Sequence, residues 1–203
     1  MPSRRRFLRS GAAAVAVGAG LAGCIFTSET VGELPRPFLG ASREDVPVIQ
    51  TFEDLQCPAC RLFTENEFPE VQQEGLETND ARFEWYDFPL PVDQQLSRPS
   101  HGAARSVQNN DSMESFWAVV DEILRQQSNI GSLEDIARIC AENADVEANT
   151  VLQEAREGVY EPVIESDVDR GEDMQVDGTP TIFVNGVQVQ PTAQDILDAV
   201  QNN

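Results

Sequence analysis

Two cysteines that are separated by two residues form the first group in the chain that could do chemistry. The segment Cys57-Pro58-Ala59-Cys60 has the CxxC spacing, which is typical both of a redox dithiol and of one half of a zinc site. A structural zinc ion needs four ligands, and the rest of the expected mature domain offers only Cys140 and His101 as thiol or imidazole donors, which do not form a second close pair. The lack of a second pair of ligands therefore favours redox chemistry, and we expect neither a metal nor an organic cofactor.

The elements expected around this motif would make one thiol reactive. Residues 46–52 are rich in Val and Ile and predict a strand that runs almost directly into the motif, with a helix after it. Cys57 would then lie near the helix N-cap, where unpaired amide hydrogens and the helix dipole stabilise a thiolate. Pro58 suits the first helical position and Ala59 adds no bulk. The three-residue step places Cys60 on the same turn, close enough for a disulfide.

A second motif lies far downstream, at Gly178-Thr179-Pro180-Thr181. It precedes a predicted hairpin in which residues 181–184 and 187–189 flank Asn185-Gly186, a pair that accepts positive backbone angles. Most peptide bonds before proline are trans, so an ordinary turn entering a strand is the alternative. Together with the CxxC segment, this loop resembles the cis-proline loop of thioredoxin-like proteins.

With these motifs and a long helical stretch between them, the chain from about residue 44 to its end resembles the DsbA-like family of extracytoplasmic disulfide oxidoreductases. The resemblance implies an α/β thioredoxin fold with an inserted helical subdomain at about 97–170. It implies that Cys57 is the exposed nucleophile and Cys60 the buried resolving thiol. Pro180 would be a cis residue packed against the pair, and Thr179 would line the substrate groove and offer its backbone to a substrate strand.

The implied activity is disulfide exchange with exported proteins that carry thiols or disulfides, together with an unidentified redox partner. Oxidase is the first expectation, from the resemblance and from the expected export. A reductase or isomerase of the same fold is the second, and a module that binds polypeptides without turnover is the alternative from another class. The intact cysteines and Thr179-Pro180 argue against that last alternative.

Two positions depart from the family pattern. Ala59 stands where the best-known strongly oxidising members have a histidine that helps to stabilise the thiolate, and Thr51 stands six residues before the nucleophile, where many members carry a buried acid. Glu53 and Asp54 are nearby candidates for proton transfer. Each of them, taken singly, is more readily interpreted as a solvated loop acid in a chain that is rich in acids.

Three other sites attract functional interpretations that we set aside. His101 is the sole histidine, but no nucleophile or orienting acid stands near it at a recognisable spacing, so capping or packing is expected. Cys140 falls on the apolar face of a predicted helix, where a free cysteine acts as a small buried hydrophobe. Phe116 and Trp117 are expected in the core.

Apolar spacing predicts the remaining elements. A helix follows the motif and ends near Gly75 with a break at Pro69, and a strand is expected at 82–88. A series of helices then forms the insertion, with Asp111 and Ser132 as expected N-caps. A helix at 151–159, after which the chain continues past Pro162 towards Asp169, completes the insertion, and the last helix is predicted at 192–200.

The N-terminus reads as an export signal. Residues 1–23 combine a charged start, an apolar Ala/Val/Gly stretch and a small-residue end, and the stretch is too short to span a membrane. Residues 3–9 resemble the twin-arginine export motif. Residues 21–24 resemble a lipobox, in which Cys24 is acylated and anchors the protein to the extracytoplasmic face of the cell membrane. The end of a plain signal, or a disulfide partner, are the alternatives for Cys24. Residues 24–43 are expected to form a flexible tether.

The charge balance is strongly acidic. The chain has 35 acidic and 14 basic residues, a formal net charge of -21, and every basic residue is arginine. Concentrated salt screens such repulsion, so adaptation to high salt is the first interpretation. A basic protein partner is a weaker one, because the acids are spread along the chain. The same charge argues against nucleic acid as a ligand.

Overall fold

A mixed sheet of five strands organises the part of the chain that the computed structural model describes, residues 34–91, 93 and 95–202. The strands are β1 (Phe38–Gly40), β2 (Val48–Glu53), β3 (Arg82–Asp87), β4 (Thr181–Val184) and β5 (Val187–Val189). Their order is β1-β3-β2-β4-β5, with β2 and β3 parallel and the other neighbours antiparallel.

The two faces of the sheet are covered by different helices. One face packs under α1 (Pro58–Asn66), α2 (Phe68–Val71), a π-helical turn η1 (Gln72–Leu76) and α8 (Ala193–Gln201), through a core that contains Ile49, Phe83 and Ile182. Their strand neighbours Phe52 and Phe183 point to the other face, which packs against α7 (Glu161–Asp173). Alternation of side chains along each strand therefore builds two separate cores.

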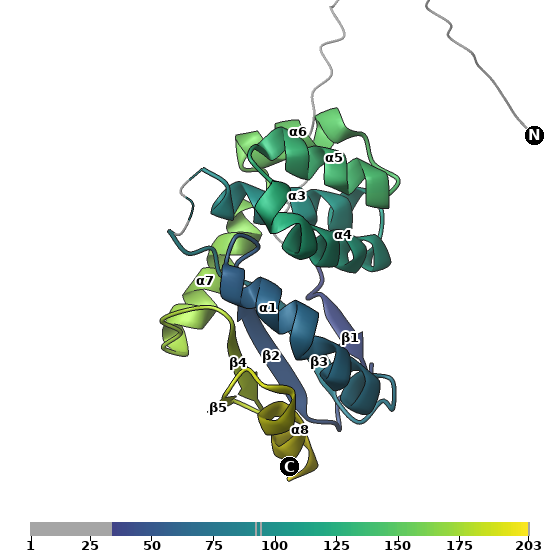
Figure 1. The fold of residues 1–203 in the computed structure, drawn as a ribbon, viewed down its shortest axis with the longest axis vertical. Coiled ribbons are helices and arrows are strands. Elements are labelled where there is room, and N and C mark those ends of the chain that lie inside the picture. Colours follow the sequence, from purple (N-terminus) through teal and green to yellow (C-terminus); the bar gives the residue numbers. More distant parts are fainter. Residues whose placement is uncertain (1–33, 92, 94, 203) are drawn as a thin grey trace, which may run out of the picture.

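The remaining helices form a lobe at one end of the molecule, the upper end in Figure 1. They are α3 (Ser97–Asn110), α4 (Met113–Gln126), a 3-10 turn η2 (Gln127–Asn129), α5 (Leu133–Asn143) and α6 (Ala148–Glu157). Phe116 and Cys140 lie in the core of this lobe, as expected, and Trp117 packs against it. Cys57, Cys60 and Trp85 belong to the same apolar cluster. The cysteine motif thus lies where the lobe meets the sheet.

Several predicted local features appear in the structure. The helix after the motif breaks before Pro69 and ends at Leu76, and the hydroxyl of Ser132 caps α5 by accepting from the amide of Asp135. Asn185 and Gly186 turn the β4–β5 hairpin with φ angles of 48° and 81°, the left-handed region that the pair was expected to adopt.

Three predictions differ from the structure. Asp111 does not cap α4; it ends α3, and Ser112 accepts from the amide of Ser115 instead, because its extended backbone directs its hydroxyl at the helix start. Phe38–Gly40, within the expected tether, pairs with β3 as an edge strand. The expected insertion also included α7, which is a separate helix after Gly158 (φ 65°) and lies against the sheet.

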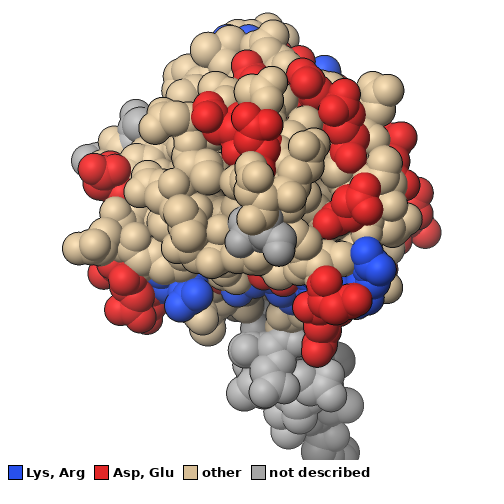
Figure 2. Space-filling model, turned by 90° about the horizontal axis from the view of Figure 1, so that it is seen from below, with Lys and Arg blue, Asp and Glu red and all other residues tan. Residues whose placement is uncertain are grey.

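The expected export signal, residues 1–23, and the expected lipid anchor Cys24 lie outside the described residues. Within the described part, no helix has the length and apolarity that crossing a membrane requires. Figure 2 looks at the molecule from the α8 end and shows acidic side chains scattered over this face rather than gathered in one patch. On this face, therefore, the acidic side chains do not form one docking patch for a basic partner.

Candidate redox site

The two cysteines occupy different environments at the start of α1. Cys57 is the N-cap residue with φ -81° and ψ 121°, and Pro58 follows in the first turn. Cys57 keeps 6% of its surface exposed and Cys60 keeps none, and both are free thiols here. Cys57 is therefore more exposed than Cys60, as expected, but it is itself largely buried.

This placement separates the pKa values of the two thiols. A hydrogen bond from the Cys60 thiol is the main reason that the pKa of Cys57 falls from 9.0 to about 5, with further help from Thr179 and from the amides of Cys60 and Ala59 and against the effect of burial. Burial raises the pKa of Cys60 well above its usual value, and the neighbouring Cys57 and Glu53 add to this. One sulfur is thus a thiolate at neutral pH and the other a thiol.

The second motif lies beside the first. The Thr179–Pro180 peptide bond is cis, and the Cys57 Sγ lies 3.3 Å from the carbonyl oxygen of Thr179. Next to this loop, Ala59, Leu62, Pro180 and Pro191 contribute to an open hollow of about 250 Å³. Leu62 is 51% exposed there, and in the described part of the chain only Val187 is a comparably exposed large apolar side chain. The hollow therefore offers an apolar surface directly beside the redox pair.

Glu53 is not the solvated acid that was expected. It ends β2 with 2% of its surface exposed, and its Oε1 accepts a 2.9 Å hydrogen bond from the hydroxyl of Thr51. Burial raises its pKa from 4.5 to about 8, and the charge of Cys57 acts in the same direction. Alternate residues of a strand share a face, so Glu53 lies on the same face as Thr51, the position where an acid was sought. This periodicity is the signal that could have identified it.

Glu53 also lines a cavity at the side of the redox pair. It measures about 270 Å³ and is lined by Glu53, Phe68, Trp85 and Trp117 among others. In the part of the chain that the structure describes, Oε2 of Glu53 and Nε1 of Trp117 are buried without a protein hydrogen-bond partner. A cavity of this size holds several water molecules, and the two residues that carry these unpaired atoms both contribute to its wall.

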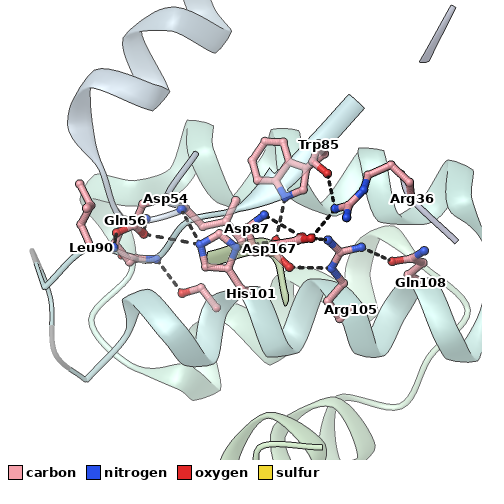
Figure 3. A network of polar contacts seen from close by, with 12 residues as sticks. Arg36, Asp54, Gln56, Trp85, Asp87, Leu90, His101, Arg105, Gln108 and Asp167 are labelled. Carbon is pink, nitrogen blue, oxygen red and sulfur yellow. Dashed lines mark hydrogen bonds and ion pairs between the residues drawn. The ribbon is translucent and has the colours of Figure 1, made fainter. Parts of the chain in front are cut away.

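Asp54 and His101 also differ from expectation, because they belong to a buried polar network (Figure 3). His101 lies on α3, with Nδ1 2.8 Å from Asp87 and Nε2 3.8 Å from Asp54. Although burial opposes it, the two carboxylates raise the pKa of His101 to about 9. Burial would raise the pKa of Asp54, but His101 and the amides of Gln56 and Leu90 have the larger effect and lower it. His101 is therefore an imidazolium that joins the lobe to the redox loop.

The network continues away from the cysteines. Arg105 binds Asp87 at 2.7 Å and Asp167 at 2.9 Å, and Arg36 binds Asp167 at 2.6 Å (Figure 3). These residues come from α3, β3, α7 and the segment before β1. Asp87 carries two cationic partners, and despite its burial the charge of Arg105 holds its pKa well below the usual range. The network fastens three layers of the fold to one another.

Comparison with known proteins decides the family. A thioredoxin family model matches residues 36–202. The chain belongs to the thioredoxin family. Disulfide bond formation protein D of Bacillus subtilis is 26% identical over 158 residues, which are 74% of this chain and 68% of that protein. A probable disulfide bond formation protein D of Bacillus anthracis is 26% identical over 167 residues, 78% of this chain and 74% of its own length.

Solved structures place this thioredoxin-family chain among DsbA-like folds. Oxidised BdbD from Bacillus subtilis superposes with a TM-score of 0.74 at 21% identity, covering 82% of this chain and 91% of that one. DsbA of Chlamydia trachomatis superposes with a TM-score of 0.70 at 18% identity, covering 82% of this chain and 88% of that one. The expected thioredoxin fold with added helices and the DsbA-like resemblance are confirmed.

Proposed function

We propose that this thioredoxin-family protein exchanges disulfides with exported proteins through Cys57 and Cys60, acting as an oxidase outside the cytoplasm. The observation that carries the proposal is the asymmetry of the pair, in which the partly accessible Cys57 has a pKa of about 5 and the buried Cys60 a raised one. A stabilised thiolate favours the reduced form of the pair, so the disulfide form is a strong electron acceptor. This favours oxidase over reductase.

The exchange runs in two steps that balance sulfur bonds and electrons. A substrate thiolate attacks Cys57 Sγ, the Cys57–Cys60 bond breaks, and Cys60 leaves as a thiolate that takes up a proton. A second substrate thiolate then attacks the substrate sulfur of the mixed disulfide, and Cys57 leaves as its stabilised thiolate. Two electrons have passed from the substrate dithiol to the pair. A redox partner, not yet identified, must remove them to restore the disulfide.

Glu53 supplies the proton that Cys60 needs. Burial raises the pKa of its carboxyl to about 8, although a hydrogen bond with the Cys60 thiol lowers it in part. The carboxyl is therefore protonated near neutral pH. A donor with a pKa near the working pH transfers a proton readily in both directions. Glu53 contributes to the wall of the side cavity, which shares no lining residue with the substrate hollow, so we propose that water reaches the carboxyl from that side. Proton exchange and substrate binding would therefore use different sides of the pair.

The substrate groove is the hollow beside Ala59, Leu62 and Pro180. An apolar side chain of an unfolded substrate would bury itself there while its cysteine reacts with Cys57. The carbonyl oxygen of Thr179 lies 3.3 Å from the Cys57 sulfur, so this backbone group would mark the end of the groove nearest the reacting atom. Unfolded polypeptides expose apolar residues near their cysteines, which folded ones do not, and the groove would select them.

The location rests on the first 24 residues. The twin-arginine-like and lipobox-like segments support export and acylation of Cys24, which would hold the domain at the outer face of the cell membrane. A Cys24→Ser variant expressed in the native host should move from the membrane fraction to the soluble fraction. Retention in the membrane fraction would contradict the anchor but not the redox activity.

Two assays at molar salt test the activity. Oxidative refolding of a reduced, unfolded protein should be accelerated by the oxidised chain, and reduction of insulin should be the weaker activity. A Cys140→Ser variant serves as the control, because it removes a buried thiol that lies in the lobe core. An inactive wild type in both assays would refute the proposal. Insulin reduction without oxidation would assign the reductase alternative instead.

A trapping experiment tests the roles of the two sulfurs. Incubated with a substrate disulfide, Cys60→Ala should accumulate mixed disulfides, because Cys57 still attacks the substrate but Cys60 can no longer displace it from the Cys57 sulfur. Cys57→Ala lacks the attacking thiol and should not accumulate them. Equal trapping by both variants would show that the assignment of nucleophile and resolving thiol is wrong.

A further inference from the structure

The polypeptide before α1 is held by a side chain of the helical lobe. Gln127 follows α4 in the turn η2, and its side-chain amide donates to the carbonyl oxygen of Leu55 at 2.8 Å and to that of Cys57 at 3.0 Å. A primary amide has two hydrogens, so both donors are used on this one loop. The second of these carbonyls belongs to the proposed nucleophile itself.

The peptide unit after Cys57 has few other constraints. Pro58 provides no N–H, so the carbonyl oxygen is the only polar atom by which this unit can be held. Within the described residues that oxygen accepts from Gln127 and, at 3.2 Å, from the amide of Arg61. The orientation of this unit decides whether the amides of Ala59 and Cys60, which follow it, are directed at the Cys57 sulfur. Contacts to the carbonyl therefore affect the share of the thiolate stabilisation that these two amides supply, in addition to the share of the Cys60 thiol.

Helix α3 holds the residues before Cys57 but does not reach it. The side-chain amide of Gln56 donates to the hydroxyl of Ser100 at 2.9 Å, and the amide of Leu55 lies 3.5 Å from Nε2 of His101. The carbonyl oxygen of Leu55, by contrast, accepts from Gln127. Among these contacts, the one made by Gln127 is nearest to the reacting atom.

We propose that Gln127 is a positioning residue, which fixes the Cys57 carbonyl so that the first amides of α1 face the sulfur and the helical lobe thereby sets the reactivity of the redox pair. The inference rests on the proposed function, because Cys57 must be the attacking thiol. It assigns to the lobe a chemical role besides covering the site. Because Ala59 has no polar side chain, its backbone amide is the only donor that this position offers to the Cys57 sulfur, beside the larger effect of the Cys60 thiol.

The test uses two glutamate variants that differ in one position. Gln127→Glu keeps the size of the side chain but replaces two donors by acceptors. Gln126→Glu adds the same charge one residue earlier, where the amide bonds Glu122 and not the loop. The measurements are the pH dependence of Cys57 alkylation by iodoacetamide and the equilibrium constant of the pair with glutathione.

We expect Gln127→Glu to raise the titration midpoint of Cys57 by about half a pH unit or more, which corresponds to roughly a threefold loss of thiolate below the midpoint. Gln126→Glu should titrate like the wild type. The equilibrium constant with glutathione should move so that the pair becomes less oxidising. A residue with a merely structural role would lower thermal stability and leave both quantities unchanged.

Gln127→Ala keeps the proposal falsifiable if the glutamate variant does not fold. It removes the donors without adding charge, and a smaller shift in the same direction supports the proposal. Wild-type titration in the folded Gln127 variants would overturn it, as would equal shifts in Gln126→Glu. If the wild type shows no exchange activity while the Gln127 variants still shift the titration, the proposed function fails and the positioning role stands.

Discussion

Replacing Glu53 by glutamine should stabilise the protein, and by more at high pH than at low pH. The glutamine keeps the size of the side chain, can accept the hydroxyl hydrogen bond of Thr51, and has no charge to bury. In the wild type, ionised Glu53 is unfavourable because the carboxyl is almost fully buried and no described residue pairs with its Oε2. The substitution removes this cost wherever the wild-type carboxyl would ionise.

The size of the effect follows from proton linkage. The pKa of Glu53 is raised from 4.5 to about 8 in the folded protein. Below pH 4.5 the carboxyl is neutral in both folded and unfolded chains, so its stabilising effect is fully present there. Between 4.5 and about 8 the unfolded chain ionises and the folded one does not, and stability falls. At ~1.36 kcal/mol for each pH unit, the loss reaches at most about 5 kcal/mol.

Denaturant unfolding in molar salt measures this loss. The oxidised protein is used, so that neither thiol of the pair titrates, and the unfolding free energies of wild type and Glu53→Gln are compared at pH 4.5 and pH 8. We expect similar values at the lower pH and a variant that is more stable by ~2 kcal/mol or more at the higher one. The gap should be larger in the reduced protein, where the charge of Cys57 adds to the effect.

Glu70→Gln is the matched control, because Glu70 is an exposed acid on α2. It should show no comparable pH dependence. A constant difference between wild type and Glu53→Gln from pH 4.5 to 8 would refute the argument, since it would show that Glu53 ionises equally in folded and unfolded chains. A wild type that is the more stable of the two at pH 8 would refute it as well.

Three further predictions follow from the site. Asp87→Asn leaves the buried guanidinium of Arg105 without its nearest carboxylate and should lower the unfolding free energy by ~3–5 kcal/mol, measured by guanidinium denaturation. Alkylation of reduced wild type should be half-maximal near pH 5 and modify Cys57, and a midpoint near 9 or labelling of Cys60 would contradict the thiol asymmetry. Ala59→His places an imidazole in the motif and should shift the glutathione equilibrium of the pair towards the reduced form, whereas an unchanged equilibrium would show that backbone donors already saturate the thiolate.

The sequence predicted the framework of the site well because its signals are local. The CxxC spacing, the proline that follows Cys57 and the strand before it all lie within 15 residues, from 46 to 60. The Asn185-Gly186 turn and the Ser132 cap are likewise decided by neighbours in the chain. Each of these features depends on backbone preferences that a residue carries into any fold.

The buried charges could not be predicted in the same way. His101 becomes an imidazolium because Asp87 and Asp54 reach it from other elements, and nothing near position 101 in the chain announces them. Glu53 has the sequence context of a solvated loop acid in a chain rich in acids, and only its position on the inner face at the end of β2 buries it. The edge strand at Phe38–Gly40 is too short to show alternation and forms by pairing with β3. Tertiary partners decide all three.

The separation between surface and buried charge explains how such a site can work in a strongly acidic protein. At molar salt the Debye length is about 3 Å, so the surface carboxylates in Figure 2 act on one another weakly. The groups that tune the cysteines are buried, and salt screens them much less. Lowering the salt should therefore reduce the unfolding free energy while the titration midpoint of Cys57 stays near 5 for as long as the protein is folded. A midpoint that follows the salt concentration would mean that the surface charge, and not the N-terminus of α1 and the Cys60 thiol, governs the reactive sulfur.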